Sequence, residues 1–124
     1  MRKTLRERGR KKKRNRKKTK SAKPGMRAKV LGRVYSNSCY FCNAMKEEWE
    51  KLTNAIRSTK IILKDIGDNY DENIQNLNKE YNVKLEANGL PTIFRILQNA
   101  DNQYSLEYYK GERTSISMMR WLNS

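Results

Sequence analysis

Histidine is absent from the 124 residues of this chain, and only two cysteines are present. The absence of histidine excludes the side chain that most often serves as a general base and as a metal ligand near neutral pH. Two cysteines without histidine fall short of the four ligands that a structural zinc site takes from one chain. We therefore expect no metal and no cofactor.

Long apolar runs are also missing. No stretch approaches the roughly 18 apolar residues that predict a membrane-spanning helix. The basic N-terminus is not followed by the apolar region of a secretory signal peptide. We therefore expect a cytoplasmic or nuclear protein that is not secreted, in a compartment where a structural disulfide would be reduced.

Acidic residues are nearly absent from the first 30 positions. Sixteen of the 28 lysines and arginines lie there beside one acid, Glu7, whereas residues 31–124 are neutral overall. The segment 1–27 has too few apolar residues to offset its chain entropy by burial. We expect it to be a disordered polybasic tail, followed by one domain at 28–124.

The densest basic run in the tail has three functional interpretations besides that of a solubilising arm. It is typical of a nuclear localisation signal, or of a segment that binds the phosphates of DNA or RNA. No aromatic residues are interleaved, so stacking on bases is not expected. Binding to an anionic membrane surface is the third interpretation. The candidate residues are Lys11, Lys12, Lys13, Arg14, Arg16, Lys17 and Lys18.

Apolar runs in the body predict four strands, at residues 28–36, 60–66, 91–97 and 104–110. The run at 60–66 is typical of a buried parallel strand. The turn-rich segment 99–103 separates the last two strands, which predicts that they form a hairpin.

Apolar residues at helical spacing predict three helices between and after these strands. The first begins at Cys39, the second covers 71–81, and the third lies near the C-terminus. The expected N-cap residues are Ser38 or Ser36 for the first helix and Thr114 or Ser115 for the third. The side chains expected to point inward are Met45, Trp49, Leu52 and Ile56, then Ile74, Leu77 and Tyr81, and finally Ile116, Met119 and Leu122.

The resulting order, β-α-β-α-β-β-α, is that of an α/β domain. Two crossovers predict three parallel strands, and the hairpin adds an antiparallel edge strand. We therefore expect a mixed four-stranded sheet with helices on both faces.

The two cysteines lie three residues apart, where the first strand gives way to the first helix. A Cys-x-x-Cys motif in that place is typical of a redox-active pair. The free N–H groups at a helix start lower the pKa of a thiol. Cys39 is therefore the candidate nucleophile and Cys42 the resolving thiol, which together form a redox-active disulfide. The alternative is that both are small buried apolar residues.

Residues 28–124 resemble the thioredoxin superfamily, in particular thioredoxin and protein disulfide isomerase domains. The resemblance lies in SCYFC at 38–42, WEKL at 49–52, GLPT at 89–92 and YKGERT at 109–114. It implies a thioredoxin-like fold and dithiol–disulfide exchange on protein substrates. We expect the protein to be a monomer. The basic tail and the Lys/Asn-rich body also resemble thioredoxin-like proteins of large DNA viruses. In such a virion the tail would meet densely packed DNA.

The resemblance also implies a substrate-binding loop. Pro91 matches the family's cis-proline, whose loop lies against the disulfide, and the backbone of Leu90 would pair with an incoming peptide. The alternative is an ordinary proline at the start of a strand. Tyr40 and Phe41 match none of the family's common dipeptides. They are candidates for a substrate platform or for half-buried packing.

Arg33 stands where thioredoxins carry a buried acid, six residues before the first cysteine. A guanidinium there could favour thiolates by its charge and tune their pKa. The alternative is a strand residue that points outward.

Two functional hypotheses of different classes follow. The first is a thiol–disulfide oxidoreductase, with the tail providing nucleic-acid association or nuclear or virion targeting. The second is a redox-inactive thioredoxin-fold scaffold whose tail binds nucleic acid. A glutathione-dependent, glutaredoxin-like protein is a variant of the first hypothesis, although Gly111-Glu112 is a poor match to the Gly-Gly and Asp of that family.

Overall fold

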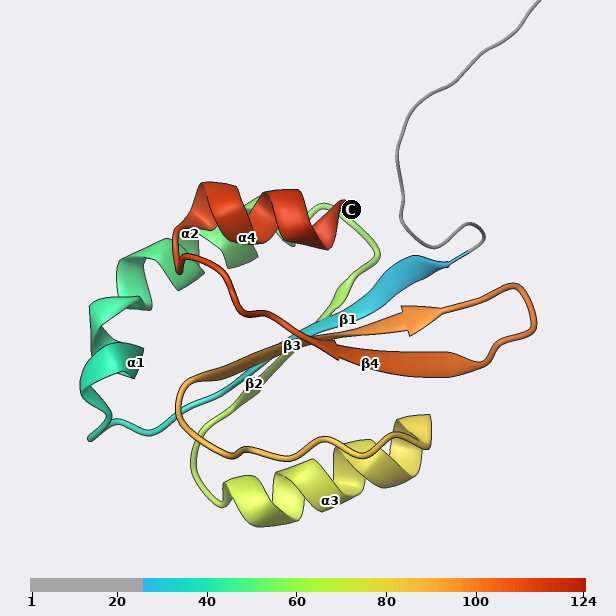
Figure 1. Cartoon of the computed structure of the whole chain (residues 1–124), viewed down its shortest axis with the longest axis horizontal. Coiled ribbons are helices and arrows are strands. Elements are labelled where there is room, and N and C mark those ends of the chain that lie inside the picture. Colours follow the sequence, from blue (N-terminus) through green and yellow to red (C-terminus); the bar gives the residue numbers. More distant parts are fainter. Residues whose placement is uncertain (1–25) are drawn as a thin grey trace, which may run out of the picture.

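The computed structural model describes residues 26–124, so the expected polybasic tail lies outside the described residues except at its last two positions. The chain forms the expected order of elements, except that the first helix is divided in two (Figure 1). The elements are β1 (Arg27–Val34), α1 (Tyr40–Ala44), α2 (Lys46–Ile56), β2 (Ile62–Ile66), α3 (Tyr70–Tyr81), β3 (Thr92–Gln98), β4 (Tyr104–Tyr108) and α4 (Ser115–Leu122).

The four strands form one mixed sheet in the order β2-β1-β3-β4. β1 and β2 are parallel, whereas β3 is antiparallel to both β1 and β4. The expectation of three parallel strands is therefore wrong. Asn82 ends α3 in the left-handed conformation (φ 55°), and the chain then runs back along the sheet before β3 begins (Figure 1). β3 consequently starts at the end of the sheet where β1 stops, with Thr92 paired opposite Val34.

β2 is an edge strand and not the buried strand that its apolar run predicts. Its residues Ile62 and Leu63 are 38% and 42% exposed. A strand with a neighbour on one side only has less of its surface covered, and composition alone does not reveal its place in the sheet.

Two helical layers cover the sheet, with α1, α2 and α4 on one face and α3 on the other (Figure 1). Side chains alternate between the faces along each strand, so β1 contributes to two separate cores. The core beneath α2 and α4 consists of Leu31, Met45, Trp49, Leu52, Ile56, Ile93, Met118 and Leu122. The core beneath α3 consists of Val30, Val34, Ile66, Ile74, Leu77, Tyr81, Leu85, Phe94 and Ile96.

Gly32 is required by the close approach of Phe94 within the second core. A Cβ atom at Gly32 would lie 2.1 Å from Cζ of the Phe94 ring, which is far inside van der Waals contact. The fully buried Phe94 ring therefore packs directly on the backbone of β1.

α4 begins at Ser115 and is capped by Thr114, whose hydroxyl accepts the N–H of Ser117. Thr114 is thus the cap, but the expected inward face is wrong at Ile116, which is 69% exposed. Met118 and Leu122 are the buried pair, one helical turn apart. No helix within residues 26–124 is long and apolar enough to cross a membrane.

Candidate functional site

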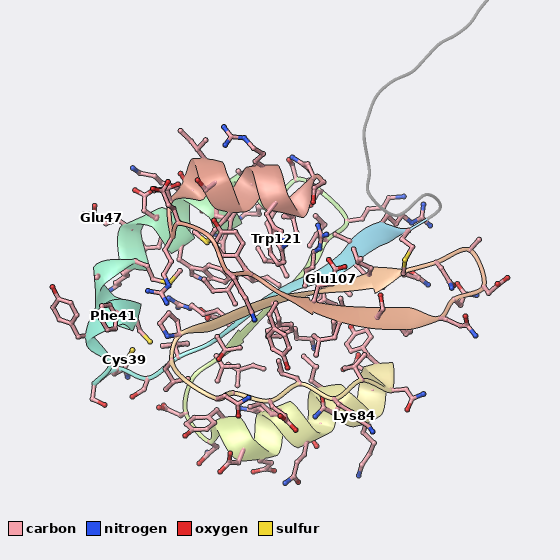
Figure 2. All side chains as sticks on the ribbon, in the orientation of Figure 1. Cys39, Phe41, Glu47, Lys84, Glu107 and Trp121 are labelled. Carbon is pink, nitrogen blue, oxygen red and sulfur yellow. The ribbon has the colours of Figure 1, made fainter. Side chains whose placement is uncertain are left out.

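Cys39 lies at the junction of the loop after β1 with α1 (Figure 2), and Cys42 lies within α1. Cys39 is itself the N-cap residue, with extended backbone (φ −83°, ψ 119°), and its Sγ accepts the N–H of Cys42 at 3.1 Å. The expectation of a serine cap is wrong, because Ser36 Oγ accepts the N–H of Ser38 at 3.2 Å instead. The capping acceptor of α1 is therefore the sulfur of the candidate nucleophile.

The environment of Cys39 favours its thiolate. Cys39 is partly exposed and its thiol is free. Burial acts to raise the pKa of Cys39, but hydrogen bonds from the Cys42 thiol and from the N–H groups of Cys42 and Phe41 outweigh it. The charge of Arg113 acts in the same direction as these bonds, so the pKa of Cys39 lies below its ordinary value.

The environment of Cys42 favours its protonated form. Cys42 is buried, and burial is the main cause that raises the pKa of its thiol. Its hydrogen bond and its electrostatic repulsion with Cys39 raise the pKa of Cys42 further, whereas contact with the backbone of Ser36 and the charge of Arg33 oppose the rise. The two thiols therefore differ chemically, with the pKa of Cys39 lowered and the pKa of Cys42 raised.

Arg33 is buried, with 7% of its surface exposed, so the interpretation as an outward-pointing residue is wrong. Its Nε and Nη2 donate to the two carboxylate oxygens of Asp65 at 3.0 and 3.1 Å. The guanidinium lies 4.1 Å from the ring centre of Tyr35 and 5.0 Å from that of Trp49. The parallel register of β1 and β2 places Arg33 directly opposite Asp65. Arg33 is therefore a buried cation that forms an ion pair with a carboxylate on the edge strand β2.

The helix that carries the cysteines breaks at Met45, which separates α1 from α2. Met45 has non-helical dihedrals (φ −96°, ψ 5°), and its N–H donates to the carbonyl of Phe41 at 3.3 Å. Its side chain is buried together with those of Trp49, Leu52 and Ile56, as expected. The break follows no proline or glycine, so no local signal in the sequence marks it.

Tyr40 and Phe41 project into solvent, with 75% and 57% of their surfaces exposed. Their rings meet edge to face with their centres 5.3 Å apart. Half-buried packing is therefore wrong for Tyr40, and the role of both residues as a substrate platform stays a prediction.

The loop before β3 reaches the same end of the sheet as the loop that leads to Cys39, because Thr92 pairs with Val34. The peptide bond between Leu90 and Pro91 in this loop is cis. Pro91 also lines a cavity of about 300 Å³ that reaches Tyr108, Tyr109 and Lys110. Neither cysteine lines this cavity.

Arg113 is a candidate site residue that inspection of the sequence missed. It belongs to the connection between β4 and α4, yet its guanidinium carbon lies 5.7 Å from the ring centre of Phe41. It lies within the YKGERT stretch, but nothing in that stretch indicates that it faces the cysteines. Within the described residues, no group of three or more Cys, Asp or Glu side chains is arranged to hold a metal ion.

No protein-family model and no curated protein matches this chain. Solved structures with a similar fold include the J-Trx1 fragment of ERdj5, with a TM-score of 0.53, 14% identity and coverage of 74% of this chain. The Trx4 domain of ERdj5 has a TM-score of 0.52 and 14% identity, with 75% of each chain covered. The first two thioredoxin domains of Naumovozyma dairenensis Eps1p have a TM-score of 0.51 and 17% identity, over 79% of this chain.

This chain spans 40% of the length of the ERdj5 fragment and 34% of the Eps1p structure. The likeness confirms the expected thioredoxin-like fold. The chain therefore combines that fold with a Cys39-x-x-Cys42 pair at the start of its first helix.

Proposed function

We propose that this chain is a thiol–disulfide oxidoreductase that acts on protein substrates. The observation that carries the proposal is the placement of the two thiols: the sulfur of the partly exposed Cys39 caps α1 by accepting the N–H of Cys42, and Cys42 is buried within that helix. The pKa shifts of the two thiols agree with this asymmetry, downward for Cys39 and upward for Cys42. A pair of structural cysteines has no need of this asymmetry, whereas a nucleophile and its resolving partner depend on it.

The proposed reaction with a substrate disulfide has two steps. The Cys39 thiolate attacks one substrate sulfur, so the substrate S–S bond breaks, a mixed disulfide forms, and the other substrate sulfur leaves and takes a proton from water. Cys42 then loses its proton to water and attacks the sulfur of Cys39, which forms the Cys39–Cys42 disulfide and releases the second substrate sulfur as a thiolate that takes a proton from water. The substrate gains two electrons and two protons, and a dithiol donor restores the enzyme. The same steps run in reverse oxidise a substrate dithiol.

Trapping of the intermediate tests this proposal. In the Cys42→Ser variant nothing can resolve the mixed disulfide, so covalent adducts with a disulfide-containing protein such as insulin should accumulate. In Cys39→Ser neither adducts nor insulin reduction should occur. If both wild-type thiols react slowly and equally with iodoacetamide and no adducts form, the redox-inactive scaffold replaces this proposal.

The polybasic segment adds a second activity to the proposal. The lysines and arginines of residues 11–18 carry a dense positive charge on a chain whose residues 31–124 are neutral. We propose that this segment binds the phosphates of nucleic acid and holds the oxidoreductase there. The alternative is a targeting signal for the nucleus or a virion, which would require the clustered order of the residues rather than their charge alone.

A further inference from the structure

We propose that Arg113, Phe41 and Tyr40 form a substrate-reading patch beside Cys39, which selects polypeptide disulfides flanked by acidic side chains. This inference rests on the proposed oxidoreductase function, because it names the substrate class of the same site.

The patch combines an aromatic surface with a cation. Phe41 and Tyr40 follow Cys39 directly in the chain, and both rings are more than half exposed. The guanidinium of Arg113 lies against Phe41, with 5.7 Å between the guanidinium carbon and the ring centre. A polypeptide whose sulfur approaches Cys39 would therefore meet these side chains with the residues next to its own cysteine.

Arg113 is held in place by contacts of the backbone on both sides of it. The hydroxyl of Tyr109 donates to the carbonyl oxygen of Glu112. The N–H of Ser115 donates to Oε1 of Glu48 at 2.8 Å, which ties the start of α4 to α2. The cation is thus presented from an anchored segment, which lowers the entropy cost of binding a partner.

The guanidinium of Arg113 has no ion-pair partner among residues 26–124. Glu48, whose carboxylate lies at the same connection, is engaged by the N–H of Ser115 and by Nζ of Lys51 at 3.1 Å. The hydrogen bond from the Ser115 backbone is the main cause that lowers the pKa of Glu48. Arg113 therefore offers its planar set of donors to a carboxylate from outside the chain.

Two disulfide peptides of identical composition test the proposal in the full-length chain. One peptide carries two aspartates next to its cysteine, and the other carries them at its far end. The basic N-terminal segment responds to net charge, which the two peptides share, so a preference between them reports the position of the carboxylates. We expect kcat/KM for the peptide with adjacent aspartates to be higher by about two- to five-fold, the effect of one exposed ion pair.

Arg113→Gln should bring this ratio to about one, and Arg113→Glu should reverse it. A change in the reactivity of Cys39 in these variants affects both peptides equally and cancels in the ratio. Arg57→Gln is the matched control, because Arg57 is an exposed arginine at the far end of α2, and it should keep the wild-type ratio.

A wild-type ratio of one, or a ratio that Arg113→Gln leaves unchanged, would overturn the reading patch, while turnover of both peptides would still support the oxidoreductase. Failure to turn over either peptide, together with slow alkylation of Cys39, would overturn both.

Discussion

Cys39 owes its low pKa partly to a single side-chain donor, the thiol of Cys42. The same contact raises the pKa of Cys42, since a shared proton cannot leave one thiol without weakening the stabilisation of the other. The two residues therefore act as a coupled pair, and their titrations belong to the pair.

Replacement of Cys42 by serine or alanine separates this donor from the backbone contacts. Serine keeps a hydroxyl that can donate to Cys39, whereas alanine keeps only the backbone N–H groups. We expect the pH at which alkylation of Cys39 reaches half its maximal rate to be higher in Cys42→Ala than in Cys42→Ser. In both variants it should stay below the value for an unfolded thiol, about 8.5. Equal midpoints would assign the low pKa to the backbone and to Arg113 alone.

The charges of Arg33 and Asp65 should shift the pKa of Cys42 in opposite directions. The cation of Arg33 favours the Cys42 thiolate, whereas the carboxylate of Asp65 should oppose it. Loss of the cation in Arg33→Met should raise the pKa of Cys42 further and lengthen the life of the mixed disulfide. Loss of the carboxylate in Asp65→Asn leaves the cation uncompensated and should lower that pKa. Alkylation of Cys42 against pH in a Cys39→Ser background measures both shifts. Shifts in the same direction would show that the pair acts through its packing on Trp49.

At the scale of the elements, α4 closes the core above the sheet, and its last turn is tied to β3 by one residue. Arg95 donates to the carbonyl oxygen of Trp121 at 2.6 Å and forms an ion pair with Glu107 on β4. Its guanidinium also lies 4.7 Å from the ring centre of Trp121, which lies between α4 and the sheet (Figure 2). These contacts anchor the last turn of α4 to β3 and β4.

Two substitutions in α4 test which side of the helix faces the core. Met118→Ala removes a fully buried side chain and should lower the free energy of unfolding by about 2–5 kcal/mol. Ile116→Ala removes an exposed side chain and should change that energy by less than about 0.5 kcal/mol. Urea denaturation of both variants measures the difference. Similar losses would mean that Ile116 is buried as the apolar spacing predicts.

At the scale of the whole molecule, the charge of +15 is confined to one end of the chain. Deletion of residues 1–25, which stops before β1, should leave thiol reactivity unchanged, since no candidate site residue of the redox centre lies there. The same deletion should abolish binding to DNA. If about eight cations contact phosphates in the full chain, log K should fall with log salt at a slope of about −7.

A scrambled order of residues 1–25 at constant composition is the control for that deletion. Phosphates are read by charge, so the scrambled chain should bind DNA as the natural one does. Loss of DNA binding on scrambling, or its persistence after the deletion, would contradict a tail that binds by charge alone.

The local sequence determined the order of elements and the place of the cysteines at a helix start, and it narrowed the cap of α4 to Thr114 or Ser115. Each of these depends on neighbouring residues, because hydrophobic periodicity and capping act over one or two turns. The resemblance carried by SCYFC, GLPT and YKGERT implied the thioredoxin-like fold.

Only the tertiary structure decided which strands are antiparallel, which strand is the edge and which charges surround the thiols. The direction of β3 depends on where the chain travels after α3, and the exposure of Ile62 depends on the strand order. The Arg33–Asp65 and Arg113–Phe41 contacts join residues far apart in the chain. Electrostatic effects depend on distance in space rather than in sequence, so residue types alone could not assign a partner to either arginine.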